Sequence, residues 1–453
     1  MDEPLSLHPE NPHYFIYNEK PTVLITSGEH YGAVINVDFN YKKYLETLYN
    51  EGLNHTRLFV GVYREFPNDY WPKNTLGPEP GRFVCPFARS NMPGALDGGN
   101  KFDLDKWDDI FFARLNDFCK IAQDYGIVIE INLFCPFYVN HHGDGRWKIS
   151  PWYHVNNIND IGEIPVEEVF TFKHPKLLKY QENMVKKIVN ELNNFNNIYY
   201  EICNEPYWDI ILPEWQDHMA DIIVDVERDL PKKHLISYNI ANGSKEVKNP
   251  YPYISIFNFH YPRRAKCQCV PLNYHLNKVI GCNETGFNGS EEEYYRVEAW
   301  QFMLSGGALY NNLDISFYAG GGEECLKIID GTKNFCGGTI FRKQIKILKD
   351  FIEKFDFIRM SPANDIIETQ DEDIEIYVLA EKGKQYGIHI FCKGKKQCES
   401  IGLKIPNGKY LVEYINVIKG EIIKSEQVIV INNKLNLKLP FFNRDIAVKI
   451  VVI

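Results

Sequence analysis

Residues 178–203 read LKYQENMVKKIVNELNNFNNIYYEIC, and they carry the pattern from which the fold is predicted. The first part repeats apolar residues at helical spacing, namely Leu178, Met184, Ile188 and Leu192. The last part, 197–203, is a short run of β-forming residues, and a similar run, IVIEINLF, occupies 127–134. A strand, a helix and a second strand in this order indicate a βαβ unit and therefore a parallel sheet.

The same alternation extends from about residue 22 to residue 360. Eight strands are expected, at Thr22–Ser27, His55–Val62, Ile127–Phe134, Asn197–Cys203, Leu235–Ile240, Tyr253–Phe259, Lys278–Cys282 and Ala308–Ile315. Eight strand and helix units over this length predict an α/β fold of the (β/α)₈ TIM barrel type, which commonly takes about 200 to over 400 residues. A doubly wound sheet is the alternative, but Ser27-Gly28-Glu29-His30 lacks the G-x-G-x-x-G turn that such a sheet needs after its first strand.

The pattern changes near residue 361, where short alternating strands replace the strand and helix units. We therefore expect a barrel catalytic domain at 1–360, with 1–20 as its lead-in, and a small all-β sandwich domain at 361–453 that packs against the barrel. Two long loops, 63–103 and 135–173, follow the second and third strands. Long loops at the carboxyl ends of barrel strands usually carry function.

Charge and hydropathy exclude several classes of partner. The chain has 453 residues, 44% of them apolar, and a formal net charge of −10. An acidic chain without a run of Lys and Arg is not expected to bind nucleic acid. No stretch of 18 apolar residues predicts a membrane span. Nothing in the sequence indicates an oligomeric state.

The cysteines indicate reduced thiols. Eleven of them are scattered through expected strands and helices, which is not a disulfide framework. Reduced thiols suit a cytoplasmic protein, or a secreted one from an anaerobic habitat whose signal peptide has been removed, and the richness in Asn, Lys and Ile is typical of an AT-rich bacterial source. Cys267 and Cys269 form a C-x-C, but no further ligands at metal spacing lie nearby, so neither a metal nor another cofactor is expected.

Two strand ends carry glutamates. The run Glu201-Ile202-Cys203-Asn204-Glu205-Pro206 ends the fourth strand, and Val279-Ile280-Gly281-Cys282-Asn283-Glu284 ends the seventh. In a closed barrel both carboxyl groups project into the mouth. Retaining glycoside hydrolysis uses such a pair, about 5 to 5.5 Å apart, one carboxyl as acid and base and the other as nucleophile.

With these motifs the chain resembles the clan of (β/α)₈ glycoside hydrolases whose glutamates end strands four and seven, closest to cellulase-like, family 5 type enzymes. The resemblance covers about residues 20 to 360. It implies that Glu205, preceded by Asn204, is the acid/base and Glu284 the nucleophile. Since the acid must begin protonated, Glu205 is expected to have the higher pKa of the two.

The resemblance implies three further site residues. Arg57 matches the arginine that keeps the nucleophile ionised, as a nearby guanidinium lowers a carboxyl pKa. His260 and Tyr261 match the pair that lines the cleavage subsite and hydrogen-bonds the nucleophile. The clan's tryptophan at the end of strand eight is absent, and Tyr310-Asn311-Asn312-Leu313-Asp314 stands there. Asp314 is therefore expected to bind a sugar hydroxyl.

Other polar and aromatic residues in the expected loops suit sugar binding, because aromatic faces stack on sugar rings and polar groups hold the hydroxyls. They are Glu29, His30, Asn132, His141, His142, Trp147, Trp152 and Trp208. The sequence thus predicts a retaining glycosidase acting on β-linked oligo- or polysaccharides. Two alternatives stay open: a carbohydrate-binding barrel without turnover, and a metal-dependent barrel hydrolase.

Overall fold

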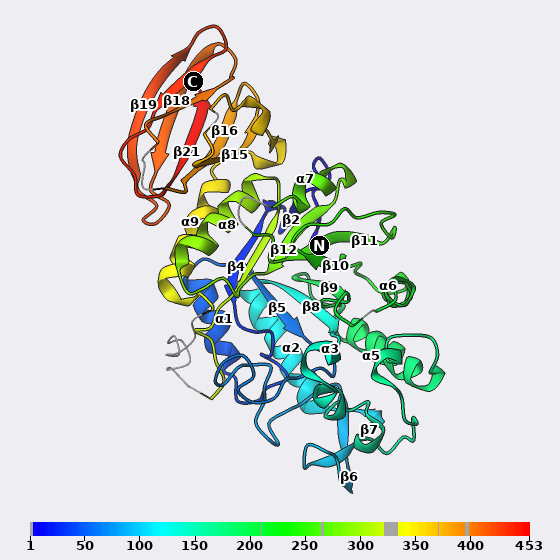
Figure 1. The fold of residues 1–453 in the computed structure, drawn as a ribbon. Helices are drawn as coiled ribbons and strands as arrows, with labels where there is room; N and C mark the ends of the chain where they lie inside the picture. Colours follow the sequence, from blue (N-terminus) through cyan, green and yellow to red (C-terminus); the bar gives the residue numbers. More distant parts are fainter. Residues whose placement is uncertain (1–2, 210, 264–266, 321–333, 370, 395–397) are drawn as a thin grey trace.

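The computed structural model describes residues 3–209, 211–263, 267–320, 334–369, 371–394 and 398–453. A barrel forms the larger part of the molecule, and a sheet-rich C-terminal part, red in Figure 1, stands at one end. The expected (β/α)₈ barrel followed by an all-β region is confirmed.

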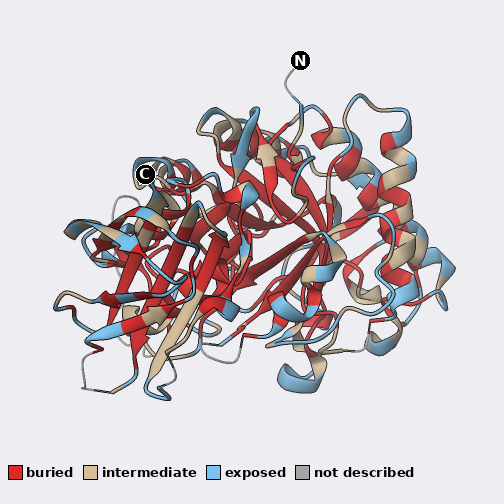
Figure 2. Cartoon of the chain, turned by 90° about the horizontal axis from the view of Figure 1, so that it is seen from above, coloured by how far each residue is buried: buried red, intermediate tan, exposed pale blue. Residues whose placement is uncertain are grey.

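The barrel sheet has eight parallel strands, and each overlaps one of the expected strands. They are β4 (Leu24–Gly28), β5 (His55–Phe59), β8 (Val128–Phe134), β9 (Ile198–Cys203), β10 (Ile236–Asn242), β11 (Ile254–His260), β12 (Val279–Glu284) and β13 (Leu309–Leu313). The hydrogen-bonded order is β4-β13-β12-β11-β10-β9-β8-β5. Figure 2 shows these strands buried along most of their length.

One side chain closes the seam between β4 and β5. Asn54 accepts a hydrogen bond from the Ile25 backbone N–H at 3.0 Å and donates one to the Val23 carbonyl at 2.8 Å. These two bonds satisfy backbone groups that no neighbouring strand pairs with, as buried N–H and C=O groups require. The sheet is therefore a nearly closed barrel.

Helices cover the outside of the barrel. They are α1 (Tyr41–Asn50), α2 (Asp109–Asp124), α5 (Pro175–Leu192), α6 (Pro213–Arg228), α7 (Cys269–Asn273), α8 (Glu292–Leu304) and α9 (Gly338–Ile352). The expected regular alternation fails after β10, because residues 243–253, all described, form no helix. This segment reads GSKEVKNPYPY, and its Gly and two Pro residues disfavour a helix.

The two long loops contain structure of their own. The loop after β5 leads into the hairpin of β6 (Phe87–Pro93) and β7 (Asn100–Trp107). The loop after β8 holds the short helices α3 (Val139–His142) and α4 (Gly145–Lys148) and two 3₁₀ turns, His154–Asn156 and Val166–Glu168. A bridge between Phe102 and Asn157 joins the two loops, so they form a continuous rim.

The lead-in folds as a small sheet of β1 (Ser6–Leu7), β2 (Phe15–Tyr17) and β3 (Lys20–Thr22). Beyond the barrel, β14 (Ser361–Pro362), β15 (Ile374–Glu381), β16 (Gln385–Cys392), β21 (Asp445–Val452), β18 (Gly408–Ile415) and β19 (Ile422–Val430) form an antiparallel sheet in that order. The pair β17 (Ser400–Leu403) and β20 (Leu435–Lys438) forms a second sheet. Short 3₁₀ turns lie at Tyr274–Leu276, Phe357–Arg359 and Asn364–Ile366.

A buried ion pair attaches this region to the barrel. Arg296 of α8 makes two hydrogen bonds to the carboxylate of Asp445, at 2.8 and 3.0 Å, and both residues are buried. Trp300 stacks on His389, with ring centroids 5.3 Å apart. The C-terminal sheet therefore packs on α8, on the outside of the barrel.

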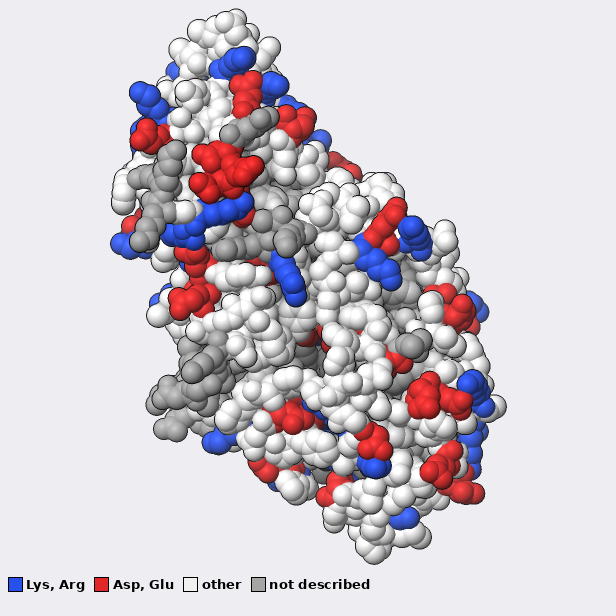
Figure 3. All heavy atoms as spheres, in the orientation of Figure 1, with Lys and Arg blue, Asp and Glu red and all other residues white. Residues whose placement is uncertain are grey.

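Charged side chains of both signs lie on the surface (Figure 3), and the described cysteines lie in the interior. Acidic and basic side chains are interspersed on the face that Figure 3 shows. Within the described ranges no helix is long and apolar enough to span a bilayer. The ten described cysteines are buried, and Cys325 lies outside the described residues. Cys267 and Cys269 approach to 3.4 Å between their sulfur atoms.

Candidate active site

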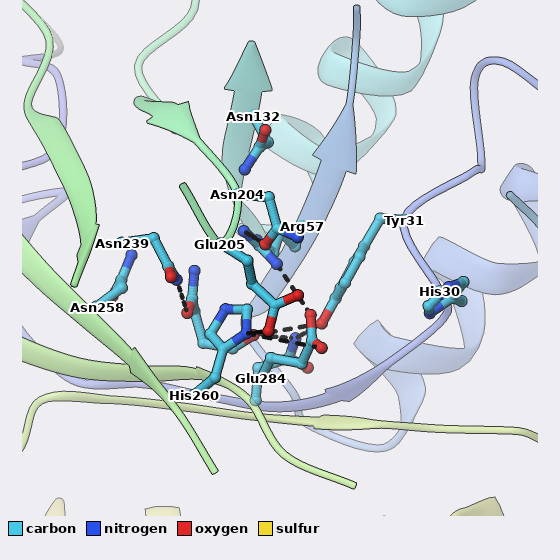
Figure 4. A network of polar contacts seen from close by, with 12 residues as sticks. His30, Tyr31, Arg57, Asn132, Asn204, Glu205, Asn239, Asn258, His260 and Glu284 are labelled. Atoms are coloured by element: carbon cyan, nitrogen blue, oxygen red, sulfur yellow. Dashed lines mark hydrogen bonds and ion pairs between the residues drawn. The ribbon is translucent and has the colours of Figure 1, made fainter. Parts of the chain in front are cut away.

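Polar side chains from several strand ends meet at the mouth of the barrel (Figure 4). Glu205 lies two residues beyond the end of β9, His260 ends β11 and Glu284 ends β12. Ligand atoms of these three residues all lie within 4.8 Å of one another. This is the one cluster of three or more His, Cys, Asp or Glu residues with such spacing in the described part of the chain.

Glu205 is held by three side chains. One carboxylate oxygen lies 3.0 Å from Nδ1 of His260, and the other accepts a hydrogen bond from the Tyr138 hydroxyl at 2.9 Å. Tyr207 donates a longer bond of 3.5 Å. Burial raises the pKa of Glu205, but the hydrogen bond and charge of His260 and the bond from Tyr138 outweigh it, so the pKa lies below its usual value.

The pKa of His260, which contacts both glutamates, is shifted in the opposite direction. Burial lowers the pKa of His260, yet the charges of Glu284 and Glu205 outweigh this and the pKa is raised. That Glu205 has the higher pKa of the two glutamates stays a prediction. The sequence predicted a bond from His260 to the nucleophile, whereas its Nδ1 is 3.0 Å from Glu205 and 3.7 Å from Glu284.

Glu284 receives two hydrogen bonds. Tyr261 donates to one carboxylate oxygen, and Nη1 of Arg57 donates to the other at 3.2 Å. Glu284 thus lies at the base of the site with both carboxyl oxygens hydrogen-bonded.

Below Glu284 the barrel interior is an ionic network. The guanidinium of Arg57 contacts Glu130 and Glu201 as well as Glu284, and all its neighbours are buried. One cation cannot balance three carboxylates. Burial, together with the charge of Glu130, raises the pKa of Glu201 to about 7 despite the nearby Arg57. Gly281 leaves room for this network, because a Cβ there would come within 2.3 Å of the Asn258 amide oxygen.

Two adjoining cavities open at this point. The outer cavity has a volume of about 480 Å³ and is lined by Tyr70, Tyr138, His141, His142, Glu205, Trp208, Asn242, Tyr261, Arg263, Gly286, Phe287 and Asn288. The inner cavity has about 50 Å³ and is lined by His30, Tyr31, Phe59, Tyr63, Glu65, Tyr70, Leu76, Tyr138, Asn204, Glu205, Tyr261, Glu284 and Phe287. The shared residues join the two into one aromatic site.

Backbone strain is concentrated around these cavities. Glu205 has φ 38°, Tyr261 φ 47°, Tyr138 φ 54°, Tyr31 φ 61° and Phe287 φ 59°. Residues other than glycine and asparagine rarely adopt this left-handed region of backbone angles, and those that do often cluster at functional sites. The strain aims bulky side chains into the cavities where strands turn into loops.

The structure gathers ten of the predicted site residues here. Asn204, Glu205, His30, Tyr261 and Glu284 line the inner cavity, and His141, His142 and Trp208 line the outer one. Arg57 and His260 contact the two glutamates directly. In addition, Nη2 of Arg57 donates to the Asn204 amide oxygen at 2.7 Å, so Asn204 is fixed beside Glu205.

Five predicted sugar contacts line neither cavity. Glu29 accepts backbone N–H groups of Gly32 and Ala33, which stabilises a turn. Asp314 is fully engaged by Ser27, Ser316 and Arg342. The other three are also buried: Asn132 donates to Glu201 at 2.7 Å, Trp147 packs on Phe137, and Trp152 packs on Phe134. Composition and loop position do not distinguish an aromatic that packs a loop from one that lines a cavity.

Sequence reasoning missed several site residues. Tyr70 and Tyr138 lie in the two long loops and Phe287 in the connection after β12, where no pattern marks them. Glu130 and Glu201 did carry a signal, because each is a charged residue in the middle of an apolar strand. A charged residue buried in this way needs a partner of opposite charge. That partner is Arg57, which lies on β5, the strand next to β8.

Tyr138→Phe tests the coupling around Glu205. Loss of the donated hydrogen bond removes a group that favours the ionised carboxyl, so the pKa of Glu205 is expected to rise. If Glu205 is the general acid, the alkaline limb of the kcat/KM profile then moves to higher pH. Tyr238→Phe is the matched control, since its hydroxyl bonds the distant Asp217 at 2.7 Å. A limb that moves equally in both variants, or in neither, contradicts the coupling.

The fold and site define a (β/α)₈ barrel with two glutamates facing each other across an aromatic cavity. Residues 80–210 match the family model "Domain of unknown function (DUF6298)". No curated protein matches the chain. Among solved structures, the chain resembles a glycoside hydrolase family 5 protein from Bacteroides vulgatus ATCC 8482 at TM-score 0.66 and 13% identity, covering 100% of this chain and 94% of that one.

Two further solved structures give the same result. One described as "Glycoside hydrolase" has a TM-score of 0.64 at 12% identity, covering 100% of this chain and 97% of that one. The endo-1,4-beta-mannanase from Rhizomucor miehei has a TM-score of 0.52 at 13% identity, covering 78% of this chain and 100% of that one. The fold is therefore similar to that of family 5 glycoside hydrolases.

Proposed function

We propose that this chain is a retaining glycoside hydrolase that cleaves β-linked oligo- or polysaccharides. The observation that carries the proposal is the pair Glu205 and Glu284, each of which places one carboxylate oxygen within 4.8 Å of an oxygen of the other in an aromatic-lined cavity. So close an approach supports the separation of roughly 5 to 5.5 Å between the carboxyl groups of retaining enzymes over the roughly 6.5 to 9.5 Å of inverting enzymes.

The proposed reaction is a double displacement. Glu284, oriented by Arg57 and Tyr261, attacks the anomeric carbon while Glu205 protonates the leaving oxygen. The proton comes from the Glu205 and His260 pair, whose atoms lie 3.0 Å apart. The glycosyl ester on Glu284 is then hydrolysed by a water that Glu205 deprotonates, which restores both carboxyl groups.

The environment of each glutamate supports these roles. Glu205 lines both cavities, so it can reach an oxygen at their junction. Glu284 lines only the inner cavity, beneath the position of a reacting ring. Aromatic side chains such as Tyr70, Phe287 and Trp208 offer apolar faces for sugars. The family 5 resemblance supports a β-linked substrate.

A screen with product analysis tests the proposal. Wild-type protein is incubated with a panel of β-linked gluco-, manno-, xylo- and galacto-oligosaccharides, and proton NMR follows the anomer that first appears. We expect at least one member to be cleaved with retention, and cleavage to be unchanged by a chelator.

Three outcomes contradict the proposal in different ways. Initial inversion refutes the double displacement. Loss of activity with the chelator favours a metal-dependent hydrolase that uses Glu205, His260 and Glu284 as ligands. Binding of a sugar without cleavage of any member favours a carbohydrate-binding barrel.

A further inference from the structure

We infer that this protein acts as an exo-glycosidase that removes one sugar at a time from the non-reducing end. The inference rests on the proposed function and adds the mode of cleavage and the class of substrate end that is recognised. It follows from the unequal cavities on the two sides of Glu205.

The glutamates assign a role to each cavity. A nucleophile lies under the ring whose anomeric carbon it attacks, and Glu284 lines the inner cavity alone. The acid lies beside the oxygen that joins this ring to the leaving group, and Glu205 lines both cavities. The glycone ring therefore occupies the inner cavity, and the leaving group extends into the outer one.

The inner cavity takes no more than one ring. Its volume is about 50 Å³. On a scale on which one water takes about 10 to 15 Å³, this equals a few water molecules. A sugar ring that enters it therefore also extends towards the outer cavity, and no second ring fits behind it. The outer cavity is nearly ten times larger, at about 480 Å³, and can take a longer leaving group.

The inner cavity has no second opening among the described residues. The side chains found in it but not in the outer cavity are all less than a tenth exposed, among them Tyr31, Phe59, Tyr63 and Leu76. By contrast, Tyr70 and Phe287, at the junction with the outer cavity, are 44% and 46% exposed. Substrate therefore enters and leaves through the outer cavity.

A polar cluster closes the end of the inner cavity. Glu65 accepts hydrogen bonds from Tyr63 at 3.1 Å and Asn74 at 2.8 Å, and it pairs with His30 at 3.3 Å. Arg146 donates to the Tyr63 hydroxyl at 2.9 Å. These residues come from the loops after β4, β5 and β8, so the cluster ties three loops together across the path that a longer glycone would need.

The cluster is a fixed wall because its charges are buried and paired. Glu65 is 4% exposed and Arg146 is 2% exposed. Separating such groups to let a second ring pass leaves unpaired charges in a dry environment, which is strongly unfavourable. One ring nitrogen of His30, Nδ1, has no protein partner and is free to bind a hydroxyl of the terminal sugar.

The test uses the wild-type protein and whichever oligosaccharide of the screen it cleaves, labelled at the reducing end. We expect the first products to be an unlabelled monosaccharide and a labelled chain one unit shorter. Capping the non-reducing terminal ring with a cyclic acetal is expected to abolish cleavage, because the enlarged ring cannot enter the inner cavity. The uncapped oligosaccharide is the matched control.

The outcomes distinguish a failure of the exo mode from a failure of the proposed glycosidase activity. Labelled chains of several lengths at the earliest times, or cleavage of the capped substrate at the uncapped rate, overturn the exo mode while the glycosidase activity stands. Release of a disaccharide overturns the single-ring inner cavity. If no oligosaccharide or aryl glycoside is cleaved, the proposed function itself fails and the exo mode fails with it.

Discussion

Glu284→Gln is expected to abolish turnover of every glycoside that the wild-type protein cleaves. The amide keeps the size and one acceptor oxygen of the carboxylate but cannot attack the anomeric carbon. Because the amide forms no glycosyl ester, we expect kcat to fall at least about 10⁴-fold. The measurement is the initial rate of sugar release, with sugar binding by calorimetry as the check that the cavity is intact.

Glu205→Gln distinguishes the two roles. It is expected to lower kcat by about 10² to 10⁴-fold on a natural oligosaccharide, where the leaving oxygen needs a proton. An aryl glycoside with an acidic phenol leaves without this proton, so its first step is expected to be largely spared. Glu284→Gln is expected to be inactive on both substrates.

Glu214→Gln is the matched control, because Glu214 is exposed on α6. It is expected to retain wild-type rates. If Glu284→Gln is the variant that is spared on the aryl glycoside and Glu205→Gln is inactive on both substrates, the roles of Glu205 and Glu284 are exchanged. If either variant keeps the wild-type rate on oligosaccharides, that glutamate takes no part in the chemistry.

Arg57→Met is expected to destabilise the fold by about 3 to 5 kcal/mol, because it leaves buried carboxylates without a cation. The guanidinium contacts Glu130, Glu201 and Glu284 at once, and it is 1% exposed. The measurement is the free energy of unfolding from denaturant titration. Arg82→Met is the control, since Arg82 pairs with Asp38 at the surface, where solvent screens the pair and its loss is expected to change stability little.

A second variant shows whether the loss comes from charge. Glu201→Gln removes one of the three carboxylates, and the pKa of Glu201, raised to about 7, indicates that this group is already partly protonated at neutral pH. Glu201→Gln is therefore expected to restore part of the stability lost in Arg57→Met. If Arg57→Met alone and Arg57→Met combined with Glu201→Gln lower the free energy of unfolding by the same amount, Arg57 acts by packing rather than by charge.

The barrel strands were predictable because their signal is local. Apolar β-forming runs such as 127–134 and 197–203 specify strands wherever they lie in the chain, and helical spacing at 178–192 specifies what joins them. The missing helix after β10 also has a local cause in its Gly and Pro residues. The β-rich composition after residue 361 likewise predicted the C-terminal sheets, and strand order placed Glu205 and Glu284 at one mouth.

The wall of the inner cavity was not predictable in this way. Glu65, His30 and Arg146 come from three loops, and nothing in the spacing of their residues states that these loops meet. The same holds for Tyr138, which bonds Glu205 from the third loop. Trp147 and Trp152 lie in that loop too, but they pack its interior and do not face the cavity.

Periodicity and strand order were enough to predict the barrel, the all-β region and the two glutamates at strand ends, because these patterns depend on neighbours in the chain. The side chains that hold each glutamate, and those that close the inner cavity beyond Glu284, became known only from the tertiary structure. Those features depend on contacts between loops distant in sequence, where burial and hydrogen-bond pairing select one arrangement. Strands and helices are specified by residues that are close together in the chain, whereas the shape of the cavity depends on residues from several loops at once.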